Sequence, residues 1–116
     1  MRKLIFILSI AIATGIAFSC SKSEDSDPNL TGSTPGPKFL ATKSIVAKSC
    51  ALSGCHIAPS NSGGVNFESE ASIVSNGSRI KSLAVDQSTM PPTGPLSASD
   101  KAIITDWINA GGKLTD

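Results

Sequence analysis

The stretch Cys50-Ala51-Leu52-Ser53-Gly54-Cys55-His56 is the most informative part of this 116-residue chain. Its two cysteines are separated by four residues, and a histidine directly follows the second one. This histidine is the only one in the chain, and these two cysteines are the only ones beyond residue 20. Because a pair of thiols beside an imidazole is a set of ligands, we expect the surrounding domain to be organised around what they bind.

The pattern is the attachment signature of a c-type haem. In such a site each thiol adds to one vinyl group of the porphyrin, and the histidine after the second thioether reaches the iron. The usual spacing places two residues between the thiols, whereas this chain has four. The extra residues must bulge outward because the vinyl groups are a fixed distance apart, and Gly54 tolerates the backbone angles of a bulge. The sequence therefore predicts one haem c, attached through Cys50 and Cys55 and ligated by His56.

A second iron ligand is available in the proline-rich loop Ser88-Thr89-Met90-Pro91-Pro92-Thr93-Gly94-Pro95. Met90 is the only methionine of the chain apart from Met1. A His/Met pair is a standard axial set for c-type haem, and it raises the reduction potential. Rigid prolines beside a weak thioether ligand lower the entropy cost of holding it in place. Met90 is therefore the predicted distal ligand.

The same residues are also compatible with other structures. Cys50 and Cys55 fit a small-loop disulfide in an oxidising compartment, with His56 as an incidental neighbour. Met90 fits a filler of gaps in a hydrophobic core. Zinc is disfavoured, because two cysteines and one histidine leave its usual set of four ligands incomplete.

Residues 1–19 have the form of a secretory signal peptide. Two basic residues precede an uncharged stretch over 4–17, which is too short for a comfortable membrane span. The stretch ends at Cys20 in a pattern that resembles a bacterial lipobox, with Ala17 where such motifs usually carry Leu. The resemblance implies cleavage before Cys20 and lipid attachment to its thiol, on the periplasmic side of a bacterial membrane or at the cell surface. Ordinary cleavage nearby, which would leave Cys20 as a stray thiol, is the alternative.

The mature chain is expected to consist of a tether and one domain. Residues 20–37 are rich in Ser, Thr, Asp, Glu, Gly and Pro, which predicts a flexible tether, and the lipobox resemblance implies that this tether is lipid-anchored. Residues 38–116 then form one small domain, whose only aromatic side chains are Phe39, Phe67 and Trp107. Domains with such thin cores usually recruit disulfides, a metal or a cofactor. The formal net charge of +1 for the whole chain is not that of a nucleic-acid-binding protein.

The hydrophobic pattern predicts an all-α domain with long loops. Helices are expected over residues 38–50, 68–74 and 78–85. Residues 87–96 contain three prolines and one glycine, so we expect a loop there.

The last predicted helix begins at Ser97, where the acid Asp100 three residues later has the form of a capping box. It ends at the C-cap signal Gly111-Gly112. Its apolar face consists of Ile103, Ile104, Trp107 and Ile108.

Over residues 38–113 the chain resembles a small class I monohaem cytochrome c domain. The similarity comprises a helix running into the Cys/Cys/His motif, the Met-Pro loop and a C-terminal helix with an aromatic residue. It implies about three to four helices and long loops wrapped around one covalent haem, with the first and last helices crossing. The same resemblance assigns the two thioethers, the proximal ligand and the distal ligand to Cys50, Cys55, His56 and Met90.

The resemblance implies an electron carrier rather than an enzyme, because protein ligands on both axial positions leave no iron site open to a substrate. Its expected partners are membrane-associated redox proteins outside the cytoplasm, not nucleic acids. One alternative is a haem-based sensor or ligand-binding module with a displaceable Met90. Another is a haem-free, disulfide-bonded interaction lipoprotein. A group of basic residues fits either a docking patch for an acidic partner or an ordinary solvated face; its members are Lys38, Lys43, Lys48, Arg79 and Lys81.

Overall fold

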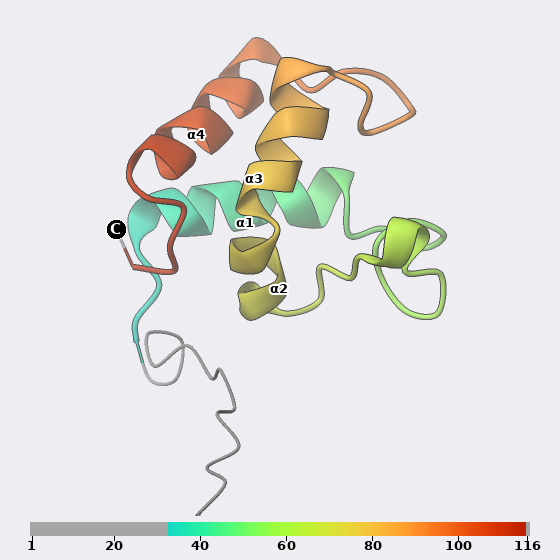
Figure 1. Cartoon of the computed structure of the whole chain (residues 1–116), viewed down its shortest axis with the longest axis horizontal. Coiled ribbons are helices and arrows are strands. Elements are labelled where there is room, and N and C mark those ends of the chain that lie inside the picture. Colours follow the sequence, from blue (N-terminus) through green and yellow to red (C-terminus); the bar gives the residue numbers. More distant parts are fainter. Residues whose placement is uncertain (1–32, 116) are drawn as a thin grey trace, which may run out of the picture.

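The computed structural model describes residues 33–115, which form helices and loops without a strand. The elements in chain order are α1 (Pro37–Ser49), a 3-10 turn η1 (Ser62–Gly64), α2 (Glu70–Ser75), α3 (Gly77–Ile80), a π-helical segment η2 (Lys81–Asp86) and α4 (Ala98–Asn109). The predicted all-α class is therefore confirmed (Figure 1). Within the described range, no helix has the length and apolar character needed to span a membrane. The predicted signal peptide and Cys20 lie outside this range.

The folded part begins slightly earlier than expected. Gly36 is buried, and its N–H donates to the carbonyl of Leu114 over 2.8 Å. Pro37 is the first residue of α1, a position where a missing N–H costs no helical hydrogen bond. The last two residues of the predicted tether over 20–37 therefore belong to the domain.

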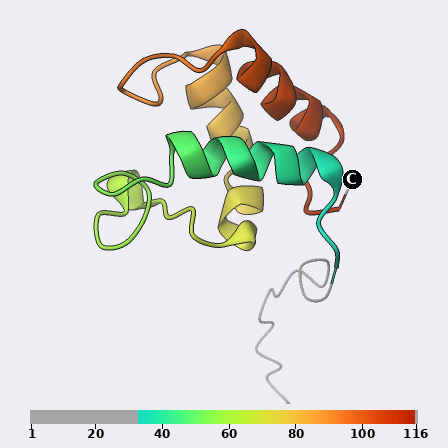
Figure 2. The same cartoon turned by 180° about the vertical axis from the view of Figure 1, so that it is seen from behind.

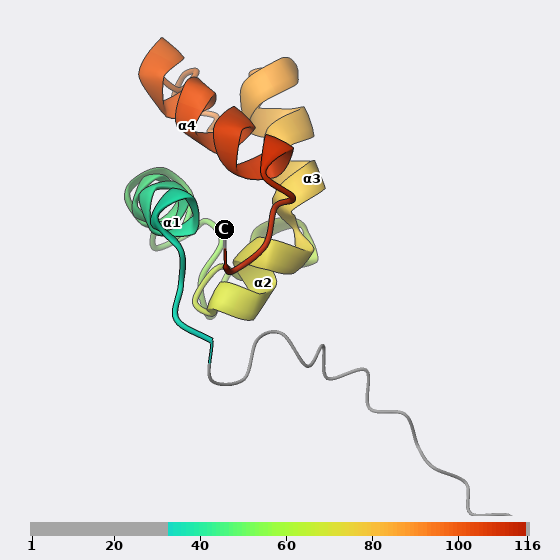
Figure 3. The same ribbon diagram turned by 90° about the vertical axis from the view of Figure 1, so that its left-hand side faces the viewer.

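The first and last helices pack together around two aromatic rings, as the resemblance implied. The ring centroids of Phe39 in α1 and Trp107 in α4 lie 6.0 Å apart, and the rings are tilted by 60°. Such tilted pairs contribute attraction beyond the area that they bury. Both side chains are fully buried, and Trp107 Nε1 donates to the carbonyl of Lys113 over 2.7 Å. Figure 3 looks along α1 and shows α4, α3 and α2 arranged around one side of it.

The predicted ends of the last helix are confirmed. The Ser97 hydroxyl accepts from the backbone N–H of Asp100 over 3.1 Å. The Asp100 carboxylate instead pairs with Lys48 of α1, at 3.2 Å. At the other end Gly112 adopts a φ of 64° and donates its N–H to the carbonyl of Trp107, which closes the helix.

The middle of the chain differs in detail from the prediction. The segment expected over 68–74 forms α2, and Asn76 separates it from α3. The segment expected over 78–85 splits into α3 and the wider π-turn η2. A segment of only six residues is too short for its apolar spacing to distinguish an α-turn from a π-turn.

Ion pairs engage three of the five basic residues that were considered as a docking patch. They are Lys43–Glu70 (2.7 Å), Lys48–Asp100 (3.2 Å) and Lys81–Asp86 (2.8 Å). Two of these pairs tie α1 to α2 and to α4. Each surface pair contributes only about 0–1 kcal/mol.

Replacing Gly77 by Ala should destabilise the domain. A Cβ at Gly77 would lie 3.0 and 3.2 Å from two ring carbons of Trp107 and 3.1 Å from Ile108 Cδ1. The Trp107 ring cannot move away from the added Cβ, because it is buried and its Nε1 donates a hydrogen bond to the carbonyl of Lys113. Despite the helix propensity of Ala, we expect a loss of about 1–3 kcal/mol in the free energy of unfolding, measured by urea denaturation. Ala at the exposed neighbour Ser78 is the control and should change stability by less than about 0.5 kcal/mol.

Replacing Thr42 by Val should stabilise the domain. Thr42 is fully buried in α1, and its Oγ1 has no hydrogen-bond partner among residues 33–115. Removing an unpaired buried hydroxyl should raise the free energy of unfolding by about 1–2 kcal/mol. The matched control is Val at Thr105, whose hydroxyl donates to the carbonyl of Lys101 over 2.8 Å. This second change should be neutral or destabilising, and equal losses in both variants would contradict the expectation.

Candidate functional site

The cysteine motif forms a closed loop at the end of α1. Cys50 caps the helix, with its N–H donating to the carbonyl of Val46 over 2.9 Å. The N–H of His56 donates back to the carbonyl of Cys50 over 3.2 Å, which closes the loop. Gly54 has a φ of 82°, a left-handed conformation that side chains other than glycine rarely adopt. The four residues between the thiols thus form a bulge whose shape depends on Gly54.

The ring of His56 is held so that one nitrogen remains available. Its Nδ1 lies 3.3 Å from the carbonyl oxygen of Val65. A carbonyl only accepts, so Nδ1 carries the proton, and in the neutral imidazole the lone pair is then on Nε2. Nε2 has no hydrogen bond to any residue that the structure describes. Phe67 packs beside the ring, with centroids 5.1 Å apart. Metal-binding histidines are usually oriented in this way, by a hydrogen bond from the ring nitrogen that does not bind the metal.

Both cysteines of the motif are free thiols. Burial, and secondarily the neighbouring Cys55, raise the pKa of the Cys50 thiol above its ordinary value. Cys50 is therefore a neutral thiol at neutral pH.

Met90 is positioned by the segment that precedes its loop. The N–H groups of Thr89 and Met90 both donate to the carbonyl of Leu83, at 2.9 and 3.2 Å. Lys101 of α4 holds the same loop through Ser88 Oγ, at 2.5 Å. The Met90 side chain stays 37% exposed, which is unlike a residue that fills a gap in the core.

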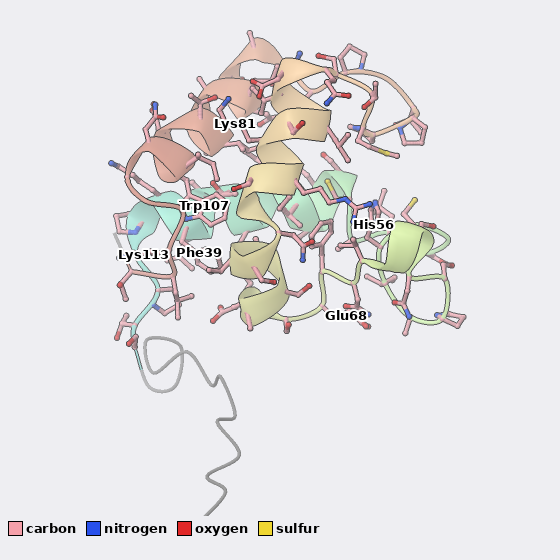
Figure 4. All side chains as sticks on the ribbon, in the orientation of Figure 1. Phe39, His56, Glu68, Lys81, Trp107 and Lys113 are labelled. Atoms are coloured by element: carbon pink, nitrogen blue, oxygen red, sulfur yellow. The ribbon has the colours of Figure 1, made fainter. Side chains whose placement is uncertain are left out.

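The four predicted site residues come together at one cleft. Two adjoining cavities enclose about 570 and 580 Å³ of space that is open to solvent. Cys50, His56 and Met90 line both cavities, and Cys55 lines the second. In Figure 2 the two loops that carry these residues project from the same side of the molecule, and Figure 4 shows His56 on that side.

The walls of the cleft were not identified from the sequence. They are apolar side chains from the loop after the motif, from α3 and from η2: Val65, Phe67, Ile80, Leu83 and Ala84. The spacing of the last three is that of one helical face, and this was the available signal. Nothing in the local sequence showed that this face, besides packing in the core, also lines a cleft.

Arg79 is the only cationic side chain among the described residues that line the cleft. Its guanidinium lies over Gly63, and a Cβ on that glycine would be 3.4 Å from Nη2. Arg79 forms no ion pair within residues 33–115. An anionic group at the rim of the cleft would therefore meet an unpaired positive charge.

Comparison of the chain with protein-family models, with curated proteins and with solved structures gives no match. The assignment of a ligand therefore rests on the cleft itself. The cleft offers a donor set of two thiols, an imidazole with a free Nε2 and a thioether. Together with the apolar walls, this donor set fits a covalently attached haem.

In the haem-free protein, Cys50 should react with iodoacetamide more slowly than in the urea-unfolded chain. The reactive species is the thiolate, and a raised pKa leaves less of it at pH 8. The rate should rise at a higher pH than it does in the unfolded chain, as followed by peptide mass spectrometry. Replacing Cys55 by Ser should shift this pH profile part of the way back. The expectation would be contradicted if the reaction rate of Cys50 rose at the same pH as in the unfolded chain, or at a lower pH.

Proposed function

We propose that this domain is a small cytochrome c-like electron-transfer protein that carries one covalent haem c. The observation that carries the proposal is the shared cleft. The only histidine, the motif thiols and the one methionine beyond residue 1 come from two separate loops and line the same space. A His/Met pair beside two thiols is the donor set of a c-type haem.

The four side chains have distinct roles in this proposal. Cys50 and Cys55 would hold the haem as thioethers, each by addition of its S–H across one vinyl double bond, which needs no external oxidant or reductant. His56 binds the iron through Nε2, because the carbonyl of Val65 already holds Nδ1–H. Met90 provides the second axial ligand through its sulfur.

When bound, the haem supplies a one-electron couple between ferrous and ferric iron. The apolar walls formed by Val65, Phe67 and Leu83 would cover part of the macrocycle and disfavour the more highly charged oxidised state. The thioether ligand shifts the potential in the same direction. Arg79 at the rim offers a positive charge to a propionate group. Together these residues favour a carrier with a relatively high reduction potential.

The expected export signal and tether fit the same function. A lipid on Cys20 would keep the domain beside membrane-bound electron donors and acceptors. A flexible tether of this length would have a root-mean-square reach of roughly 20–25 Å, which lets the domain reorient between them.

A second candidate is a haem-based sensor, and the exposure of Met90 favours it. Met90 is 37% exposed as a residue, and a ligand on such an exposed loop is accessible to competition from a small molecule. Rapid binding of carbon monoxide to the reduced wild-type protein would support the sensor over the carrier.

The decisive experiment is expression of the chain together with a cytochrome c maturation system. We expect haem to stay on the polypeptide after denaturing electrophoresis, as detected by haem peroxidase staining. Alanine at both Cys50 and Cys55 should abolish the stain. A colourless product with a Cys50–Cys55 disulfide would overturn the proposal and support the haem-free interaction lipoprotein.

Replacing Met90 by Ala should remove the weak near-infrared sulfur-to-iron band of the oxidised holoprotein and lower its reduction potential. The matched control is Ala at Leu52, an exposed residue of the cysteine loop that does not line either cavity. This control should leave the band and the potential unchanged. An unchanged spectrum in the Met90 variant would remove Met90 from the site.

A further inference from the structure

The π-helical segment η2 leaves one backbone carbonyl without its usual helical partner. In an α-helix the N–H of Gln87 would donate to the carbonyl of Leu83, four residues earlier. Here it donates to Ser82, five residues earlier, over 3.0 Å. The shift of one residue makes the carbonyl of Leu83 available to groups outside the helix.

The loop that carries Met90 uses this carbonyl. Leu83 O accepts from the N–H of Thr89 at 2.9 Å, from the Thr89 hydroxyl at 3.2 Å and from the N–H of Met90 at 3.2 Å. Three donors from two adjacent residues therefore converge on one oxygen. Because Leu83 also lines the cleft, this anchor connects the cleft wall directly to the methionine.

A second contact spans the same turn. Lys81 Nζ donates to both carboxylate oxygens of Asp86, at 2.8 and 2.9 Å. These residues are five positions apart and are the first and last residues of η2. The pair thus bridges the turn that exposes the carbonyl of Leu83.

We propose that Thr89 is a positioning residue for Met90, and that it acts through the carbonyl of Leu83 that the π-turn makes available. This inference rests on the proposed function in one respect, namely that Met90 is an iron ligand. The hydroxyl of Thr89 adds a side-chain hydrogen bond to the two backbone bonds, so it helps to hold the loop against the cleft wall at Leu83. Weakening this anchor favours release of the methionine and entry of a competing ligand.

The test is an imidazole titration of the ferric holoprotein, followed by visible absorption. Thr89→Val keeps the shape of the side chain and removes only its hydroxyl. The apparent affinity for imidazole should rise about 2–10-fold, which is the effect expected of one lost hydrogen bond. Thr89→Ser, which restores the hydroxyl, should return the affinity to within about twofold of wild type.

The matched control is Thr93→Val in the same loop, because Thr93 is exposed and its hydroxyl makes no hydrogen bond to the described residues. It should bind imidazole as wild type does. Amide hydrogen exchange gives an independent readout, since the Met90 N–H should exchange faster in Thr89→Val than in Thr93→Val.

The positioning role of Thr89 and the ligation of iron by Met90 are overturned by different results. Equal imidazole affinities for Thr89→Val and Thr93→Val, in a holoprotein that shows the sulfur-to-iron band, would overturn the role of Thr89 alone. A wild-type chain without covalent haem, or without that band, would overturn Met90 ligation and the positioning role with it.

Discussion

The contact between Trp107 and Phe39 holds the domain together, and the position of the cleft depends on it. The Trp107 ring is fully buried between α1 and α4, and the close approach of Gly77 brings α3 against the same ring. The helix α1 leads directly into Cys50, while α3 and η2 lead into the loop of Met90. By fixing these helices relative to one another, the ring also sets where the two loops face each other.

The aromatic pair and the walls of the cleft lie at different ends of one continuous hydrophobic core. The aromatic pair and the C-terminal segment form the core at one end, where the carbonyls of Lys113 and Leu114 receive hydrogen bonds from Trp107 and Gly36. The loops at the other end line the apolar cleft. An apolar cleft open to water is unfavourable, and covering it would add burial that so thin a core lacks. A bound macrocycle would therefore contribute to stability as well as to function.

Much of the fold followed from local signals. The helix α1 and the loop over 87–96 were predicted from apolar spacing and prolines, and Ser97 and Gly112 mark the ends of α4 as expected. These signals work because caps, prolines and glycines act on the backbone of their own segment. The π-turn η2 was not predicted, because its geometry depends on hydrogen bonds that six residues of apolar pattern do not specify.

The sequence by itself determined which side chains have the chemistry to bind a haem, because Cys50, Cys55, His56 and Met90 stand out by type, spacing and scarcity. Only the tertiary structure decided that they share one cleft, that the carbonyl of Val65 leaves Nε2 of the histidine free, and that the carbonyl of Leu83 anchors the methionine. The reason is physical: ligand chemistry belongs to single side chains, whereas a cleft and its backbone anchors form only when distant segments pack together.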